Sequence, residues 1–185
     1  GTVVPNPQTG NPKPRLIRYS KHQSLVNSMG FPSQGLDVIV NRLQLTYDRP
    51  TPIFVSIAAN DEQGYVTCFR RLERLADAIE MNISSPNTKG LRIFQEPKRL
   101  EHLISRLNIT QQTPVFLKLP PYSNERERER IMRLAQAGVL SGISGFTLIN
   151  TVPIDESKLK VGRGGLSGPL IYPQMLQAVK ELRQE

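Results

Sequence analysis

The chain has 185 residues, of which 38% are hydrophobic and 22% charged, a composition that suits a folded globular protein and argues against an intrinsically disordered one. No apolar run reaches the ~18 residues that a membrane-spanning helix needs, and a single cysteine, Cys68, excludes an internal disulfide. A net charge of +8 is common among nucleic-acid-binding proteins, but the basic residues are spread along the chain without interleaved aromatics, so no nucleic-acid partner is expected.

Short apolar segments alternate with segments of helical periodicity after a proline-rich opening, residues 5–14, that we expect to be extended. The expected strands cover residues 52–57, 78–83, 114–119 and 143–149. The expected helices cover residues 36–47, 64–75, 97–107, 125–137 and 172–183. Strands that are almost continuously apolar and are separated by helices are typical of a parallel sheet covered by helices, so we predict an α/β fold.

Two α/β architectures fit this order of elements, an open doubly wound sheet and a closed (β/α)8 barrel. The open sheet usually carries a glycine-rich phosphate turn after its first strand, and no GxGxxG or GxxxxGK[ST] string is present. Polar residues instead follow several strands, as at Asn82, Lys118 and Asn150, and strand ends that share one site are typical of the barrel. Because a complete barrel needs eight strands and about 250 residues, we predict an incomplete TIM barrel, a single partial domain over residues 1–185.

Three features are interpreted as structural rather than functional. Cys68 falls in an expected helix, where a small buried apolar residue is a commoner role than a reactive thiol. Residues 124–130 alternate in charge after Asn124, a residue type that often caps helices, which predicts a solvated helix face with local ion pairs. His22 and His102 lie far apart without HExxH spacing, so no metal site is predicted.

Residues 82–92, NISSPNTKGLR, are the most informative stretch of the sequence. Two carboxamides, Asn82 and Asn87, flank a serine pair and a proline, and each carboxamide offers a hydrogen-bond donor and an acceptor. That arrangement is complementary to a cyclic ureide, whose ring edge alternates N–H and C=O groups. The same residue types also form ordinary turns, so composition alone leaves both interpretations open.

The string NISSPNTKGLR resembles the catalytic-loop motif of class 2 dihydroorotate dehydrogenases. Other strings match the same family in the same order: GTV at residues 1–3, PQ at 7–8, GNPKPRL at 10–16, NSMGF at 27–31, Lys118 after an apolar strand, Asn150 with Thr151, and GGLSG at 164–168. The resemblance covers nearly the whole chain. It implies an FMN-dependent barrel, of which this chain runs from the end of the second strand to the helix after the sixth.

In this family dihydroorotate is oxidised to orotate in pyrimidine (UMP) biosynthesis, with a proton leaving C5 and a hydride passing from C6 to FMN. The resemblance implies that Ser85 is the catalytic base. It implies substrate-binding roles for Asn27, Met29, Gly30, Phe31, Asn82, Asn87, Asn150 and Thr151. It implies FMN contacts for Thr2, Asn82, Lys118 and Gly168. The backbone of residues 29–31 would close over the substrate, and Lys118 would place a positive charge near the flavin, which favours its reduced form.

The electron acceptor is judged from a few positions. Serine at position 85 is typical of class 2 enzymes, which use a quinone, whereas class 1 enzymes carry cysteine there. Three residues depart from the class 2 pattern, namely Ser28 for an arginine, Ser56 for an FMN-contacting asparagine and Ile149 for a threonine. SIA at 56–58 and KLPPY at 118–122 resemble class 1 instead. Ser85 favours quinone over fumarate or NAD.

The family's first strand and last two strands, with the loops that bind the FMN phosphate, fall outside this chain, and no initiator methionine or signal peptide is visible. We expect an internal fragment that is unstable or inactive alone. The expected location is cytoplasmic, peripheral on the inner face of the membrane, with any membrane contact made through segments outside the chain. Two alternatives stay open. Another flavin-dependent, pyrimidine-directed barrel enzyme is disfavoured by Ser85, and an inactive basic binding protein is disfavoured by the intact residues 82–88.

Overall fold

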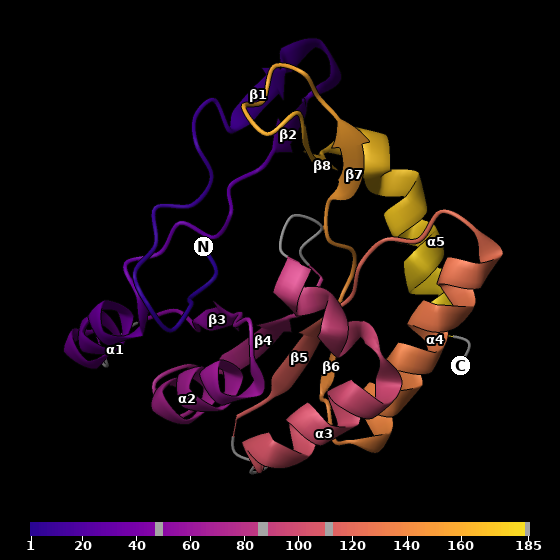
Figure 1. Ribbon diagram of the computed structural model, residues 1–185. Coiled ribbons are helices and arrows are strands. Elements are labelled where there is room, and N and C mark those ends of the chain that lie inside the picture. The colour runs from indigo at the N-terminus through magenta and orange to yellow at the C-terminus, as the bar shows by residue number, and fades with distance from the viewer. Residues whose placement is uncertain (47–49, 85–88, 110–112, 184–185) are drawn as a thin grey trace.

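Two four-stranded sheets organise the computed structural model, which describes residues 1–46, 50–84, 89–109 and 113–183. One sheet is parallel, in the order β3-β4-β5-β6, with strands Phe54–Ile57, Ala78–Asn82, Val115–Lys118 and Gly145–Thr147. The other is antiparallel, in the order β1-β2-β8-β7, with strands Leu16–Tyr19, Ser24–Asn27, Arg163–Ser167 and Val152–Asp155. Figure 1 shows the antiparallel sheet lying beyond one end of the parallel strands.

Helices connect each parallel strand to the next. The α-helices are α1 (Leu36–Leu45), α2 (Glu62–Leu72), α3 (Pro97–Leu107), α4 (Glu125–Leu140) and α5 (Tyr172–Leu182). The short 3-10 helices are η1 (Ser20–His22), η2 (Lys89–Gln95) and η3 (Pro169–Ile171). Figure 1 shows α2, α3 and α4 following the outside of the parallel sheet. The parallel strands and the helices between them therefore confirm the predicted order of these elements.

Local sequence signals account for these helices. The side chain of Asn124 accepts a hydrogen bond from the backbone N–H of Glu127 at 2.9 Å, which confirms the predicted cap of α4. Arg128 pairs with Glu125 at 2.8 Å on the exposed side of the same helix, as the alternating charges predict. Helix α3 begins at a proline and buries one apolar stripe, made of Leu100, Leu103, Ile104 and Leu107.

The parallel sheet buries its outer face and leaves its inner face open. The outward-facing side chains belong to the main core with α2, α3 and α4, and they are at most 6% exposed: Val55, Ile57, Ile79, Met81, Val115 and Leu117. On the inner face Phe54 is 61% exposed, and its ring lies 5.1 Å from that of Phe116. An open inner face is what part of a barrel leaves, because the side chains that fill a barrel come from all of its strands.

The proline-rich opening, residues 5–14, forms no helix and makes one isolated bridge, from Gln8 to Ser33, and the residues before it extend the parallel sheet. Val3 lies beside β3 in a parallel bridge to Ile57. Its N–H donates to the carbonyl of Ser56 at 2.7 Å, and its carbonyl accepts from the N–H of Ala58 at 3.0 Å. Val3 thus occupies the place expected for the end of a preceding barrel strand.

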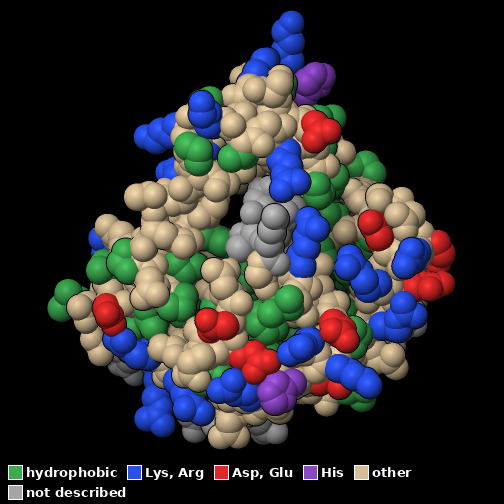
Figure 2. All heavy atoms as spheres, viewed as in Figure 1, with side chains coloured by type: hydrophobic (Ala, Val, Ile, Leu, Met, Phe, Trp, Pro, Cys, Tyr) green, Lys and Arg blue, Asp and Glu red, His purple; other side chains and the backbone are tan. Residues whose placement is uncertain are grey.

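Basic and acidic side chains occur together on one face of the molecule. Figure 2 shows Lys and Arg side chains interspersed with acidic ones on the face in view. Within the described residues, no helix is long and apolar enough to cross a membrane. The same part of the chain contains no group of three or more His, Cys, Asp or Glu residues placed to hold a metal ion.

Candidate active site

The carboxyl ends of the parallel strands carry polar side chains on the inner face. Asn82 ends β4 and lies in register with Lys118, which ends β5, and Lys118 lies in register with Thr147 at the end of β6. Neighbours in register point to the same face of a sheet, and side chains alternate between faces along a strand. Glu80 therefore shares the inner face with Asn82. The barrel prediction placed the site at this end of the strands.

Asn82 is connected by hydrogen bonds to the opening segment of the chain. Its side-chain nitrogen donates to the hydroxyl of Thr2 at 3.3 Å, and that hydroxyl lies 3.1 Å from the hydroxyl of Ser56. The buried Tyr65 donates its hydroxyl to the Asn82 carbonyl at 2.9 Å. Asn82 is 4% exposed, so these contacts fix its orientation.

Ser84 links Asn82 to the segment that follows β6. The Asn82 side-chain oxygen accepts from the Ser84 N–H at 3.3 Å and from its hydroxyl at 3.2 Å. The side-chain nitrogen of Asn150 donates to the Ser84 hydroxyl at 2.9 Å, and the Asn150 oxygen accepts from the Thr151 N–H at 2.8 Å. We call Thr2, Ser56, Asn82, Ser84, Asn150 and Thr151 the carboxamide network. It joins predicted substrate-binding and cofactor-binding residues from three segments.

The network leaves donors for a ligand. A carboxamide nitrogen carries two hydrogens. Within the described residues, the nitrogens of Asn82 and Asn150 each have one hydrogen-bond partner, so each keeps one N–H. Two oriented donors at one end of a sheet suit a planar ring with carbonyl oxygens on its edge, which is the chemistry of both a pyrimidine-dione and the flavin ring.

Lys118 forms a partly buried ion pair beside the network. Its ammonium lies 3.6 Å from the Glu80 carboxylate, and the two side chains are 24% and 13% exposed. The pair holds the lysine on the inner face, where partial desolvation strengthens its field. Glu80 is a site residue that the sequence analysis missed. The signal was there, because Glu80 is a charged residue inside the apolar strand β4, two positions before Asn82.

The antiparallel sheet brings Asn27 close to the network. Asn27 ends β2 in register with Gly165 of β8. A Cβ atom on Gly165 would lie 1.9 Å from the Thr151 hydroxyl, so Thr151 packs directly on the glycine backbone. Strand β8 therefore connects Asn27 to the neighbour of Asn150.

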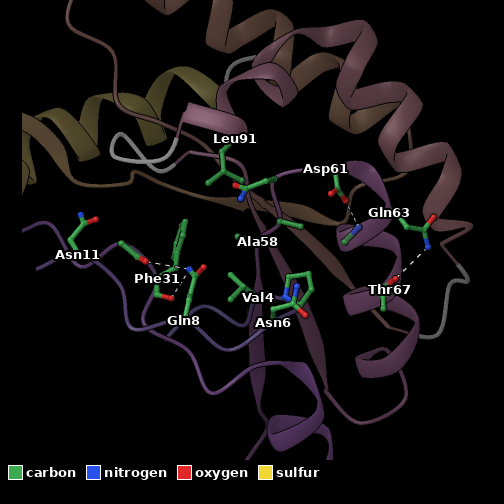
Figure 3. A pocket seen from close by; sticks show the side chains of 15 residues that line it. Val4, Asn6, Gln8, Asn11, Phe31, Ala58, Asp61, Gln63, Thr67 and Leu91 are labelled. Carbon is green, nitrogen blue, oxygen red and sulfur yellow. Dashed lines mark hydrogen bonds between the residues drawn. The ribbon is translucent and has the colours of Figure 1, made fainter.

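The predicted residues Gly30 and Phe31 line a cavity with residues of the opening segment, of the segment after β3 and of α2. The cavity has a volume of about 540 Å³, and its apolar side includes Val4, Ala58 and Leu91. Figure 3 shows the Phe31 ring standing in this space above Gln8. The backbone carbonyl of Met29, the preceding predicted residue, accepts from the N–H of Asn11 at 2.9 Å. The structure thus places residues 29–31 beside the opening segment.

Gly168 lies apart from the carboxamide network. It has φ +114°, and a Cβ there would lie 2.7 Å from the Gln23 carbonyl, so only glycine fits at this turn. With Leu148 and Ile149 it lines a second cavity of about 480 Å³. That cavity includes the two residues immediately before Asn150 and no residue of the carboxamide network.

Two of the predicted site residues cannot be placed, and the single cysteine is buried. Ser85 and Asn87 lie outside the described residues. Cys68 is buried, and burial raises the pKa of its thiol to about 12, which confirms its structural interpretation.

A family profile described as dihydroorotate dehydrogenase matches residues 1–185. The chain is 38% identical over 194 residues to the "Dihydroorotate dehydrogenase (quinone)" of a Nitratiruptor species, and 35% identical over 200 residues to the protein of that name from Xanthomonas campestris pv. campestris. These alignments cover 100% and 99% of this chain but 54% and 57% of the relatives. The chain spans little more than half the length of these curated relatives.

Solved structures agree. The crystal structure of a ligand-free DHODH from Eimeria tenella matches with a TM-score of 0.85 and 28% identity, covering 100% of this chain and 61% of that one. A structure of DHODH from the same organism in complex with ferulenol matches equally well, at a TM-score of 0.85. The fold is an incomplete (β/α)8 barrel, as predicted.

Proposed function

The chain belongs to the dihydroorotate dehydrogenase family, and on this premise we propose that the protein oxidises dihydroorotate to orotate with FMN as the hydride acceptor. The observation that carries the proposal is the carboxamide network, in which Asn82 and Asn150 are joined through Ser84. A pair of oriented carboxamides is what recognition of a pyrimidine-dione requires. Because the chain spans little more than half of its relatives, we extend the proposal to an enzyme that needs further segments for activity.

The residues at the strand ends fit FMN. Thr2 and Asn82 offer hydrogen-bonding groups from the network, and Lys118 adds a positive charge on the same face. Gly168 would contribute its backbone from the turn after β8, where it lines the second cavity. The chemistry that FMN supplies when bound is acceptance of the hydride from C6 of the substrate. Lys118 favours the negative charge that a flavin gains on reduction, and Glu80 orients and partly neutralises that lysine.

The substrate would be held by side chains from both sheets. Asn27, Asn82, Asn87 and Asn150 would bind the pyrimidine ring and its carboxylate, with Thr151 adjacent. The backbone of residues 29–31 would cover the ring. Ser85 would remove the proton from C5. A serine is a weak base, so it needs to pass its proton to a neighbour or to water.

A quinone is the proposed electron acceptor. Relatives that carry "(quinone)" in their names and Ser85 in place of cysteine both support it. Because quinones are dissolved in membranes, the enzyme would act as a peripheral protein at the inner face of the membrane, through segments outside this chain.

The proposal is tested by anaerobic visible absorbance of the FMN-loaded protein in its longest natural form, before and after dihydroorotate is added. We expect the bound flavin to bleach, and Lys118→Met to bleach more slowly while still binding orotate. Lys98→Met is the matched control, because Lys98 is an exposed lysine of α3, a helix on the outer side of the parallel sheet. Bound FMN that dihydroorotate does not bleach would refute the assignment.

A further inference from the structure

A short segment of the chain holds the backbone that is proposed to cover the substrate. We call residues 8–11 the strap and residues 28–31 the substrate loop. The side-chain nitrogen of Asn11 donates to the carbonyl of Ser28 at 3.0 Å, and the backbone N–H of Asn11 donates to the carbonyl of Met29 at 2.9 Å. The side-chain nitrogen of Gln8 donates to the next two carbonyls, at 3.3 Å and 2.8 Å (Figure 3). All four carbonyls of the substrate loop therefore bind the strap.

The two segments also interlock through glycines. Gly10 has φ +77°, and a Cβ atom on it would lie 2.3 Å from the Met29 carbonyl oxygen. Gly30 has φ +68°, and a Cβ atom on it would lie 2.7 Å from the Asn11 nitrogen. Side chains at these positions would separate the backbones, so the close approach is a built feature of the fold.

Ser28 contacts Asn11 through its side chain as well as its backbone. Ser28 is 1% exposed, and its hydroxyl lies 2.9 Å from the Asn11 side-chain nitrogen, so one carboxamide contacts both the carbonyl and the hydroxyl of this residue. The class 2 pattern has an arginine at this position. Ser28 therefore contacts the strap through Asn11, while its own backbone N–H donates to the carbonyl of Arg15 at 2.9 Å.

Binding the carbonyls leaves the substrate loop with donors. The backbone N–H groups of Met29, Gly30 and Phe31 have no hydrogen-bond partner within the part of the chain that the structure describes. A loop whose carbonyls are all bound and whose N–H groups are free has a positive electrostatic potential on its open side. Such a surface suits a carboxylate, the charged group of dihydroorotate.

We propose that Gln8 and Asn11 are positioning residues, which orient the substrate loop so that its free N–H groups meet the carboxylate of the substrate. Neither side chain needs to touch the substrate, because each acts through the backbone carbonyls of the loop. This inference rests on the proposed dihydroorotate dehydrogenase function and adds two residues to it.

The test replaces each amide donor with an isosteric acceptor, in the FMN-loaded protein in its longest natural form. Gln8→Glu and Asn11→Asp keep the side-chain shape but cannot donate to the carbonyls of the loop. We expect the Kd for orotate and the KM for dihydroorotate to rise by about tenfold, and kcat, flavin content and Tm to change by little, because only ligand binding depends on the loop's orientation. Gln8 is exposed, so its variant folds even if Asn11→Asp does not.

Asn6→Asp is the matched control. Asn6 is an exposed carboxamide on the rim of the same cavity, and the change adds the same negative charge without removing a bond to the substrate loop. If Gln8→Glu and Asn11→Asp bind orotate as Asn6→Asp does, the positioning role is wrong. Equal losses of kcat and flavin content would indicate a merely structural role and would overturn it as well. Wild-type protein that binds FMN but not orotate would overturn the proposed function together with this inference.

Discussion

The parallel and antiparallel sheets are stabilised by different means. The main core cluster draws buried residues from β3, β4, β5 and the helices, and, within the described residues, none from β1, β2, β7 or β8. The parallel sheet is thus held by apolar burial, the dominant favourable contribution to folding. The carboxyl ends of its strands carry the polar site residues.

The antiparallel sheet depends on close backbone approach and polar contacts. A Cβ atom on Gly164 would lie 2.7 Å from the Asn27 carbonyl. The hydroxyl of Tyr19 donates to the carboxylate of Glu156, which is 8% exposed and also accepts from the Lys158 N–H at 3.0 Å. Because this sheet carries Asn27 and the start of the substrate loop, changes in it should alter ligand binding more than global stability.

The largest expected effect tests whether apolar burial stabilises the parallel sheet more than the antiparallel one. Phe69 lies in α2, is 1% exposed and belongs to the main core. Phe69→Ala should lower the free energy of unfolding by about 3–5 kcal/mol, because it removes buried surface and leaves a cavity. Val26→Ala, at a fully buried residue of β2 outside that core, should cost about 1.5 kcal/mol. Urea unfolding of the longest natural form measures both, and equal losses would contradict the comparison.

The next effect separates binding from stability. Gly164→Ala would push a methyl group against the Leu159 side chain and the Asn27 carbonyl, which we expect to cost about 1–3 kcal/mol and to weaken orotate binding. Gly138→Ala is the control in α4, where the nearest atom would lie 3.5 Å away. That change should stabilise the protein by up to about 1 kcal/mol and leave binding unchanged. Thermal unfolding and orotate titration give both values, and unaltered binding in Gly164→Ala would argue that the sheet has no role at the site.

The difference between the sheets also explains what the sequence could predict. Strands β3 to β6 are short apolar runs between amphipathic helices, and each lies within a predicted range. Strand β8 reads RGGLS, whose glycines are typical of a loop in sequence and are required here by contact with Asn27 and Thr151. Such contacts are nonlocal, so no periodicity within the strand could reveal them.

The candidate site likewise contains residues that the sequence could predict and residues that it could not. Thr2, Asn82 and Asn150, for which the resemblance implied binding roles, meet in the carboxamide network, and those roles stay predictions. The contacts of Gln8 and Asn11 were not predicted, because a strap that binds carbonyls distant in sequence has no local signature. Polar residues at strand ends are therefore predictable, and the segments that position them are not.

A smaller effect tests the polar contact within the antiparallel sheet. Tyr19→Phe removes the hydroxyl that donates to Glu156 and leaves the Lys158 N–H as a remaining partner. We expect a local cost of about 1 kcal/mol, because a buried acceptor loses one of its donors. Amide hydrogen exchange should speed up in β1 and β7 and stay unchanged in β4. Faster exchange in β4 as well would mean that the two sheets open as one unit.

The smallest effect concerns the contact that joins the region after β8 to the helices of the parallel sheet. In α5, Glu181 accepts from the hydroxyl of Tyr122 at 2.6 Å and from the Nε of Arg128 at 2.7 Å. The Tyr122 hydrogen bond in particular, together with the nearby guanidinium, lowers the pKa of the Glu181 carboxyl below its usual value. A carboxyl whose pKa is lower in the folded state stabilises the fold above its unfolded pKa of about 4.3, and this contribution is lost as the pH falls through the folded pKa.

Glu181→Gln should therefore lower the free energy of unfolding by about 0.5 kcal/mol at pH 7, and the difference from wild type should vanish as the pH falls through the lowered pKa of Glu181. Tm measured against pH for the two proteins checks this, with Glu129→Gln as a control on an exposed residue of α4. A difference that persists in acid would show that Glu181 acts through packing rather than charge. If the difference vanishes while orotate binding stays equal in both proteins, the Glu181 contacts of α5 stabilise the helical layer and do not affect ligand binding. Changes in ligand binding are then expected from the antiparallel sheet alone.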